Sequence, residues 1–568
     1  MHKKSFVIIG LLLVISVYFT ACSSGNKEEI SENTELAERG QQLFIQNCSA
    51  CHNLFQTSIG PKLAGITDQV EVEWIRAFIK NPQSLIDAGD ERAKRLFGEF
   101  KTYMPAFGFL PEEDIEAMIA FLKSQKSSGL MDSLQAVDAL ADPIPDSILG
   151  SGIVIELEQV AQIPPSSDKS PLARINKLDF DPSTGDTYIL DLRGKLYRMG
   201  EGKTEVYLDM AAEKSKFIHV PGLGTGFGSF AFHPDFARNG LLYTSHTEPP
   251  DAAKADFAYA DSIPAVVQWV LSEWKTGQPG KVPFVGESRE LFRINMVTGI
   301  HGVQEITFNP LAKPGESDYG MLFISIGDGG SAENGYSFLL HNHEDAWGNI
   351  LRIDPAGRNS ANGKYGIPGD NPFTGSDNPK TLKEIYALGF RNPHRITWSA
   401  SGQMLVTNIG HQNIESIYVL QPGDDCGWPV REGAFTINPA GNMDVVFALP
   451  GEDSMYHYAY PVAQYDHDEG DAISGGFDYT GNDVPALKGK YVFGDVVSGR
   501  LFFVEVNQLE RGKMAPVYEW QVSLDGVTKP LREICDNKRV DLRFGKDAHG
   551  NLYVFTKADG KVYWLAGD

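Results

Sequence analysis

A loose repeat that starts near residue 178 constrains the fold of this chain more than any other feature. Each copy joins an apolar segment that contains an aromatic residue to a second apolar segment, with a polar turn rich in Pro, Asp or Gly between them. The copies begin at Leu178, Phe230, Ile306, Ile396, Gly475 and Leu542. Each copy has the pattern of two strands joined by a turn. Six such units favour an all-β six-bladed β-propeller over a pair of β-sandwiches.

The propeller is expected to span residues 153–568 and to close through its first strand. The segment "IVIELEQV" at 153–160 precedes the first repeat and has the composition of a strand. Pairing of this strand with the last blade would leave no sheet edge exposed at the closing point.

The segment before the propeller has a helical periodicity instead. Helices are predicted over 35–46, 70–82 and 111–125, the last with Pro at its start, acidic residues in its first turn and one apolar face. We therefore predict a multidomain chain, with a small all-α domain over 35–127, a linker over 128–152 and then the all-β propeller.

The motif "CSACH" identifies the small domain as a carrier of covalent haem. Cys48 and Cys51 have the spacing that forms the two thioether bonds of haem c, and His52 follows directly as a ligand of the iron. A structural zinc site would need a second pair of Cys or His residues, and none lies in this region of the sequence. Haem c is therefore the expected cofactor.

The second axial ligand of that iron is expected to be Met104. It lies in "TYMPAFGFL", a loop between the second and third predicted helices, whereas Met118 falls on the apolar face of the last helix, where packing is the simpler role. The whole segment resembles the small class I c-type cytochromes, and "GPKLAGI" at 60–66 matches the loop on their histidine side. The resemblance implies a one-electron carrier.

The first residues have the features of an export signal. A positive start precedes the apolar run 6–17, which is too short to span a membrane comfortably, and Cys22 follows Ala21. This ending resembles a bacterial lipobox. We expect a signal peptide over 1–21, a lipid on Cys22 and a polar tether over 22–34; cleavage that leaves a free cysteine is the alternative. The mature protein would be an exported lipoprotein anchored to a membrane, on its periplasmic side or at the cell surface.

The charge of the chain argues against a nucleic-acid partner. The formal net charge of −24 excludes the basic footprint that nucleic acid requires.

Once the lipid and haem cysteines are assigned, Cys426 and Cys535 remain. In an oxidising compartment they could form a disulfide, and the alternative is two buried free thiols; the sequence leaves both open.

Five segments of the propeller region together resemble the glucose/sorbosone dehydrogenase family. They are "HGVQEITFNP" at 301–310, "GNILRIDPAG" at 348–357, "EIYALGFRNPHRITW" at 384–398, "CGWPVREG" at 426–433 and "LKGKYVFGDVVSGRL" at 487–501. The likeness extends over roughly residues 165–568. It implies a quinoprotein dehydrogenase on a six-bladed propeller, with pyrroloquinoline quinone (PQQ) and calcium as cofactors and a sugar or alcohol as substrate.

The resemblance also assigns roles to individual residues. His301 is the base that takes the proton of the substrate hydroxyl, because an imidazole exchanges protons near neutral pH. Gly410 and His411 would offer backbone carbonyls to calcium. The side chains that would contact PQQ, whose carboxylates suit such donors, are Arg391, Asn392, Arg539 and Arg543.

Two departures from the family pattern indicate that the cofactor contacts are altered. Where the related enzymes carry a Gln, this chain has Gly224 or Thr225, and where they carry a Lys it has Val497. Glucose is therefore not assumed as the substrate.

Taken together, the sequence predicts an enzyme that oxidises a sugar or alcohol and passes electrons through the haem to an external acceptor. Tethering the haem to the dehydrogenase would raise the effective concentration of the acceptor. The alternative is a non-enzymatic binding propeller, without PQQ, fused to an electron-carrier domain. A hydrolase or lyase ranks last, because it would leave the haem without a role.

Overall fold

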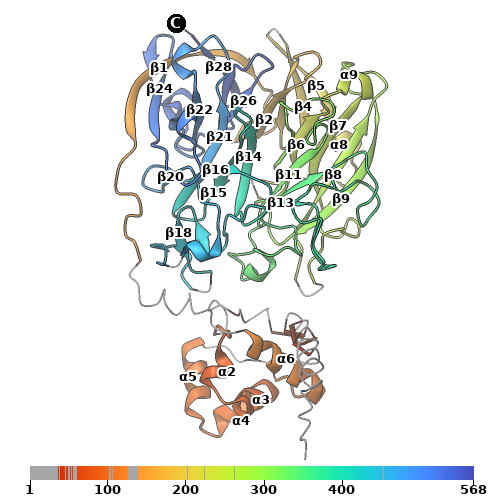
Figure 1. Ribbon diagram of the computed structural model, residues 1–568, viewed down its shortest axis with the longest axis vertical. Helices are drawn as coiled ribbons and strands as arrows, with labels where there is room; N and C mark the ends of the chain where they lie inside the picture. The colour runs from red at the N-terminus through yellow and green to blue at the C-terminus, as the bar shows by residue number, and fades with distance from the viewer. Residues whose placement is uncertain are drawn as a thin grey trace, which may run out of the picture. The chain divides into compact units, whose positions relative to one another are not determined.

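The computed structural model describes residues 36–37, 39–41, 43–44, 47–48, 52, 54, 61–100, 104, 106–125 and 139–567, apart from 201, 223, 261–262, 440 and 452. The predicted signal peptide, Cys22, the tether and Cys51 lie outside these residues. The chain forms two compact units, one helical and the other built from strands (Figure 1).

The smaller unit is all-α, as its periodicity predicts. Its helices are α2 (Ile66–Gln69), α3 (Val72–Lys80), α4 (Pro82–Asp87), α5 (Glu91–Phe100) and α6 (Glu112–Ser124). Helix α6 follows Pro111 and carries three acidic residues in its first turn, which face the positive end of the helix dipole. Among the described residues, none of the helices combines the length and apolar character needed to cross a membrane.

Packing of α3 against α6 forms the core of this unit. Ile75 and Ile79 of α3 are buried against an apolar face of α6 that includes Met118, which is 1% exposed. Met118 is therefore a core residue, as expected. The helical residues before the haem motif cross α6 closely, because a Cβ on Gly40 would lie 1.9 Å from the carbonyl oxygen of Ala117.

The larger unit is a six-bladed β-propeller, as the repeat predicts, with four strands in each blade. Blade 1 contains β2 (Ile175–Phe180), β3 (Thr187–Asp191), β4 (Lys195–Gly200) and β5 (Lys203–Asp209). Blade 2 contains β6 (Phe227–Phe232), β7 (Leu241–Glu248), β8 (Val267–Lys275) and β9 (Glu287–Met296). Blade 3 contains β10 (Glu305–Phe308), β11 (Leu322–Ile326), β12 (Asn349–Ile353) and β13 (Ile385–Ala387).

The second half of the ring follows the same plan. Blade 4 contains β14 (Asn392–Trp398), β15 (Met404–Ile409), β16 (Ile414–Leu420) and β20 (Ala463–Asp466). Blade 5 contains β21 (Ile473–Asp478), β22 (Lys490–Asp495), β23 (Leu501–Glu505) and β24 (Tyr518–Leu524). Blade 6 contains β26 (Leu542–Lys546), β27 (Leu552–Thr556), β28 (Lys561–Ala566) and the early strand β1 (Leu149–Gln162).

Short strands, helices and 3₁₀ turns lie in the loops between these strands. They are the sheet β17 (Arg431–Glu432), β18 (Phe435–Ile437) and β19 (Val446–Phe447), the strand β25 (Val527–Thr528), the helices α8 (Met210–Glu213), α9 (Phe236–Asn239) and α10 (Leu531–Ile534), and the 3₁₀ turns Ser337–Leu339, Asp453–Tyr456, Pro485–Leu487 and Val506–Gln508.

Strand β1 closes the ring in the way the sequence predicts. It pairs antiparallel with β28 and parallel with β24, so it completes blade 6 and also covers the edge of blade 5. The inner strands β2, β6, β10, β14, β21 and β26 each contact the next, and β26 contacts β2. Strand β1 starts at Leu149, and Ile144 donates its N–H to the carboxylate of Asp466 at 2.9 Å. The end of the predicted linker is therefore part of the propeller.

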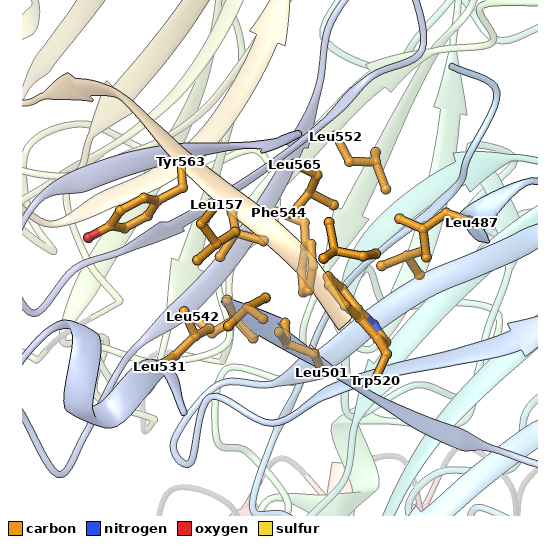
Figure 2. Packing of buried hydrophobic residues seen from close by; sticks show 14 of the residues in the cluster. Leu157, Leu487, Leu501, Trp520, Leu531, Leu542, Phe544, Leu552, Tyr563 and Leu565 are labelled. Atoms are coloured by element: carbon orange, nitrogen blue, oxygen red, sulfur yellow. The ribbon is translucent and has the colours of Figure 1, made fainter. Parts of the chain in front are cut away.

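A hydrophobic cluster forms the joint between blades 5 and 6. Leu157 of β1 packs with Trp520 of β24, Phe544 of β26 and Leu565 of β28, all of them buried (Figure 2). Burial of these side chains fixes β1 between two blades that are far from it in sequence.

The two remaining cysteines do not form a disulfide. Cys426 and Cys535 are buried free thiols that belong to different hydrophobic clusters. Burial raises the pKa of both thiols, that of Cys535 to about 11, so both stay in the unreactive protonated form at neutral pH. Of the two alternatives that the sequence left open, the structure has the free thiols.

A buried charge network crosses the centre of the ring. Lys177 of β2 donates from Nζ to Glu305 Oε1 of β10 at 2.6 Å and to the carbonyl oxygen of Ile306 at 2.8 Å. Arg395 of β14 forms an ion pair with the second oxygen of Glu305. The three charged side chains are at most 4% exposed. Blades 1, 3 and 4 are thereby joined.

This network predicts a strong effect of Glu305→Ala on stability. The substitution removes the carboxylate that Lys177 and Arg395 share and leaves Lys177 with the more distant carboxylate of Asp179, at 3.6 Å. We expect the free energy of unfolding to fall by about 3–5 kcal/mol. The matched control is Glu205→Ala, because Glu205 pairs with Arg198 at the surface with its side chain 56% exposed. That variant should lose at most about 1 kcal/mol. Denaturant unfolding followed by tryptophan fluorescence measures both, and equal losses would contradict the assigned role.

Candidate functional site

A polar cavity with a volume of ≈ 170 Å³ lies where the inner strands of the propeller begin. All six blades contribute a residue at, or shortly before, the start of the inner strand: Arg174, Gly224, Gln304, Asn392, Ala472 and Asp541. The cavity also contains His301, Arg539 and Arg543, three of the residues predicted to act here. Ring closure therefore brings together residues that lie hundreds of positions apart in the sequence.

His301 is held in a fixed orientation by Asp328. Its Nδ1 lies 2.8 Å from Asp328 Oδ1, and the Asp328 side chain is fully buried. Asp328 also accepts hydrogen bonds from the backbone N–H of Gly330 at 2.8 Å and from Trp428 Nε1 at 3.1 Å. The backbone of His301 has a φ of 50°, a left-handed conformation that non-glycine residues adopt only where surrounding contacts impose it.

This arrangement decides which nitrogen of His301 can act as a base. An ionised carboxylate only accepts hydrogen bonds, so Nδ1 carries the hydrogen and Nε2 keeps its lone pair. The side chain is 11% exposed, and the residue lines the cavity. His301 therefore meets the geometric requirement for a general base that acts on a hydroxyl group in the cavity.

Positive charge dominates the remainder of the cavity. Arg174, Arg539, Arg543 and Lys557 line it, and the one carboxylate among the lining residues is Asp541, which accepts from Arg539 Nε at 2.8 Å. Burial lowers the pKa of Arg543 to about 10 and, together with the nearby charge of Arg193, that of Arg174 to about 10. Both guanidinium groups remain charged at neutral pH.

His394 adds a neutral imidazole to this wall. Burial, followed by the charge of Arg543, holds the pKa of His394 well below its usual range. Its Nδ1 is buried and has no hydrogen-bond partner within the described part of the chain. An unsatisfied polar atom and several cations facing one cavity fit an anionic ligand that also accepts hydrogen bonds, and PQQ has that chemistry.

Arg391 takes part in a neighbouring network rather than lining the cavity. Its guanidinium pairs with Glu333, donates to the carbonyl oxygen of Gly410 and lies 5.9 Å from the centre of the Trp428 ring. Burial opposes ionisation of Glu333, but the hydrogen bond from His411 and the charge of Arg391 outweigh it and lower the pKa of this carboxyl. Asn392, in contrast, lies in the cavity wall.

One of the two backbone carbonyls predicted to bind calcium is occupied by another contact. The carbonyl oxygen of Gly410 accepts a hydrogen bond from Arg391, and the backbone N–H of His411 donates to Glu432 at 2.7 Å. The described residues contain no group of three or more His, Cys, Asp or Glu side chains that could hold a metal ion. A guanidinium group thus stands where the sequence predicts a cation to be bound.

The described residues predicted to bind haem have local contacts that suit this role. The Nδ1 of His52 lies 3.0 Å from the carbonyl oxygen of Pro61, which orients the ring and leaves Nε2 for the iron. Cys48 and Met104 both border the apolar cluster around Met118. Cys51 lies outside the described residues. Burial lowers the pKa of His52, which favours the neutral form that binds iron.

Several residues of the cavity were not predicted from the sequence. Asp328 could have been predicted from the sequence. It lies in "GDGG", which follows β11, and antiparallel pairing of β11 with β10 places this segment beside the loop that precedes β10. Arg174, His394 and Lys557 could not have been predicted, because they converge only when the ring closes.

Two family models match the chain. The model described as Glucose / Sorbosone dehydrogenase matches residues 180–564, and the model described as Cytochrome c matches residues 37–126. These ranges agree with the propeller and the helical unit.

Individual relatives cover less of the chain. HIPL1 protein from Arabidopsis thaliana is 28% identical over 335 residues, 51% of this chain and 44% of that protein. Quinoprotein glucose dehydrogenase B from Acinetobacter calcoaceticus is 24% identical over 250 residues, 41% of this chain and 42% of that protein. The chain therefore matches less than half the length of these two relatives.

A solved structure shares the architecture of the propeller. The apo-form of soluble aldose sugar dehydrogenase from Escherichia coli aligns with a TM-score of 0.50 at 20% identity, over 73% of this chain and 99% of that one. This likeness concerns the fold alone. Since the first family match extends over more than half of the chain, this protein belongs to the glucose/sorbosone dehydrogenase family and carries a cytochrome c domain ahead of its propeller.

Proposed function

We propose that this protein oxidises a sugar, such as an aldose, or an alcohol, and passes the electrons through its haem c to an external acceptor. The observation that carries this proposal is the pair His301 and Asp328, which faces a cavity lined by cationic side chains. The pair supplies a base, and the cations supply a binding site for an acidic cofactor.

In this proposal the protein holds PQQ and moves a proton. When bound, PQQ would supply an ortho-quinone that accepts a hydride from the substrate, and with it both electrons. Arg174, Arg543 and Asn392 would hold its acidic groups. His301 would take the hydroxyl proton of the substrate at Nε2, while Asp328 stabilises the imidazolium that forms.

The haem domain would be the electron outlet. Haem c, held by Cys48, Cys51, His52 and Met104, would carry one electron at a time to a cytochrome or another carrier of the respiratory chain. The lipid on Cys22 and the export signal would place the protein on the outer side of a membrane, near such carriers. The proposal assigns no step to calcium, because the carbonyl oxygen of Gly410 accepts a hydrogen bond from Arg391.

A binding propeller without PQQ is the second candidate. It is favoured by one observation, that Arg391 is engaged with Glu333 instead of lining the cavity. The hedgehog-interacting protein of Mus musculus is 25% identical to this chain over 393 residues, and its name describes binding. The orientation of His301 by Asp328 favours the enzyme, because a binding surface has no need of a base.

The proposed reaction is tested by the absorption of the haem. Haem-loaded protein is mixed with PQQ, with or without calcium, and then with a panel of aldoses and alcohols. We expect a substrate-dependent reduction of the haem. His301→Gln should lower kcat/KM by a factor on the order of 10²–10⁴, because it removes the base. The control is His549→Gln, at an exposed turn between β26 and β27, which should be unaffected.

The outcomes separate the two candidates. Failure of the protein to bind PQQ would support the binding propeller. Reduction of the haem at the same rate in His301→Gln and in the wild type would show that His301 is not the base.

Asp328→Asn tests the positioning role of the carboxylate. The substitution removes the negative charge that stabilises the imidazolium. Where the amide turns its N–H toward Nδ1, the hydrogen of the imidazole moves to Nε2 and the base is lost as well. We expect kcat to fall by a factor on the order of 10²–10⁴ with a nearly unchanged KM. Steady-state kinetics over a range of pH measures this. A purely structural role would instead lower the melting temperature and leave the pH profile of the residual activity unchanged.

The axial ligand of the haem is tested by its reduction potential. Met104→His replaces a thioether that favours reduced iron by an imidazole, and we expect the potential to fall by on the order of 0.1 V. Met118→Leu is the matched control, because Met118 belongs to the buried core. Redox titration of the isolated full-length protein measures both. A fall in the reduction potential of Met118→Leu, with no change in that of Met104→His, would identify Met118 as the axial ligand.

A further inference from the structure

Lys557 is a buried lysine that lines the cavity. It follows β27 directly, lines the cavity and is 6% exposed. Its backbone N–H donates to the carbonyl oxygen of Asp541 at 3.3 Å, but its side-chain amine has no hydrogen-bond or ion-pair partner within the described part of the chain. Leaving such a group unpaired in the interior is costly, and this indicates a missing binding partner.

The other cations of the cavity have contacts that Lys557 lacks. Arg539 donates to Asp541, and Arg543 donates to the carbonyl oxygen of Leu542 at 2.7 Å and to Asn176. Arg174 donates to the carbonyl oxygens of His219 and Thr225, both at 2.9 Å. Asp541 is the one carboxylate lining the cavity, so its charge cannot balance three arginines together with a protonated Lys557. A ligand with about three negative charges would restore the balance.

Gln304 occupies the space beside Gly224. Gln304 Nε2 donates to the carbonyl oxygen of Gly224 at 2.8 Å, and both residues line the cavity. A Cβ on Gly224 would lie 2.8 Å from this same nitrogen. A larger residue at 224 and Gln304 in its present position therefore exclude each other. The amide at this wall of the cavity comes from blade 3 instead of the loop before blade 2.

We propose that Lys557 is a cofactor-binding residue of this propeller, whose ammonium group forms an ion pair with a carboxylate of the bound PQQ. The proposal rests on the function proposed above and adds to it a contact that the sequence did not predict. Lys557 thus supplies the amine that is absent at Val497, from a different blade of the ring.

Binding through Lys557 has a measurable consequence for protons. Burial, followed by the charge of Arg543, holds the pKa of Lys557 well below its usual range, although Asp541 acts in the opposite direction. The other charged or titratable groups that face it are Arg174, Arg539 and the neutral His394. A carboxylate of the ligand stabilises the charged form, so formation of the ion pair raises the pKa of Lys557, and protons are taken up from solvent at any pH where part of the amine is unprotonated.

The test uses calorimetric titration of PQQ into full-length, haem-loaded protein at mildly alkaline pH. Titrations in buffers with different ionisation enthalpies count the protons taken up. For Lys557→Met we expect affinity to fall by about tenfold to hundredfold and the uptake to disappear. Lys557→Arg, which stays charged, should retain most of the affinity without the uptake. Lys546→Met, a substitution of a lysine of β26 outside the cavity, is the matched control and should bind like the wild type.

The outcomes distinguish failure of the role of Lys557 from failure of the proposed function. If the wild type binds no PQQ, the proposed function fails. If the wild type binds PQQ and Lys557→Met binds it with equal affinity and equal proton uptake, the role of Lys557 is overturned while the proposed function stands. Circular dichroism and the haem spectrum establish that each variant is folded, and Lys557→Arg provides the measurement if Lys557→Met does not fold.

Discussion

The ion pairs of Glu305 with Lys177 and Arg395 are the interaction on which the propeller depends most. These side chains come from inner strands of blades 1, 3 and 4, so the ion pair between Lys177 and Glu305 joins blades that are not neighbours in the ring. Removing three charges from water is costly, and the cost is offset only when all three groups are in place. Each inner strand starts at the cavity end of the propeller, so holding these strands in register also fixes the residues that precede them.

Charges are paired in this network, whereas in the cavity they are only partly paired. At the centre of the ring, the carboxylate of Glu305 lies between two cations and pairs with both of them. In the cavity, several cations share Asp541, and the side-chain amine of Lys557 and Nδ1 of His394 have no hydrogen-bond partner among the described residues. Uncompensated charge destabilises a fold, and its concentration at one place is a common property of binding sites. The contrast within one domain supports a polyanionic ligand.

Arg391 illustrates how a motif can be present while its geometry differs. The residue stands in "GFRNP" as the family resemblance predicts, yet it pairs with Glu333 and the carbonyl oxygen of Gly410. The acidic partner Glu333 lies in the loop after β11. This loop is not among the five segments that resemble the family. Local sequence therefore identified the residue type but not its contacts.

The sequence by itself determined the haem motif, the apolar faces of the helices and the six strand pairs. These features depend on short-range spacing, on which thioether attachment, helical periodicity and strand pairing directly rely. Only the tertiary structure decided the partner of His301, the free state of Cys426 and Cys535, and the meeting of Arg174, Asn392 and Lys557 in one cavity. These contacts join blades that are remote in the chain. The physical reason is ring closure by β1, because only a closed ring sets the distance between its first blade and its last.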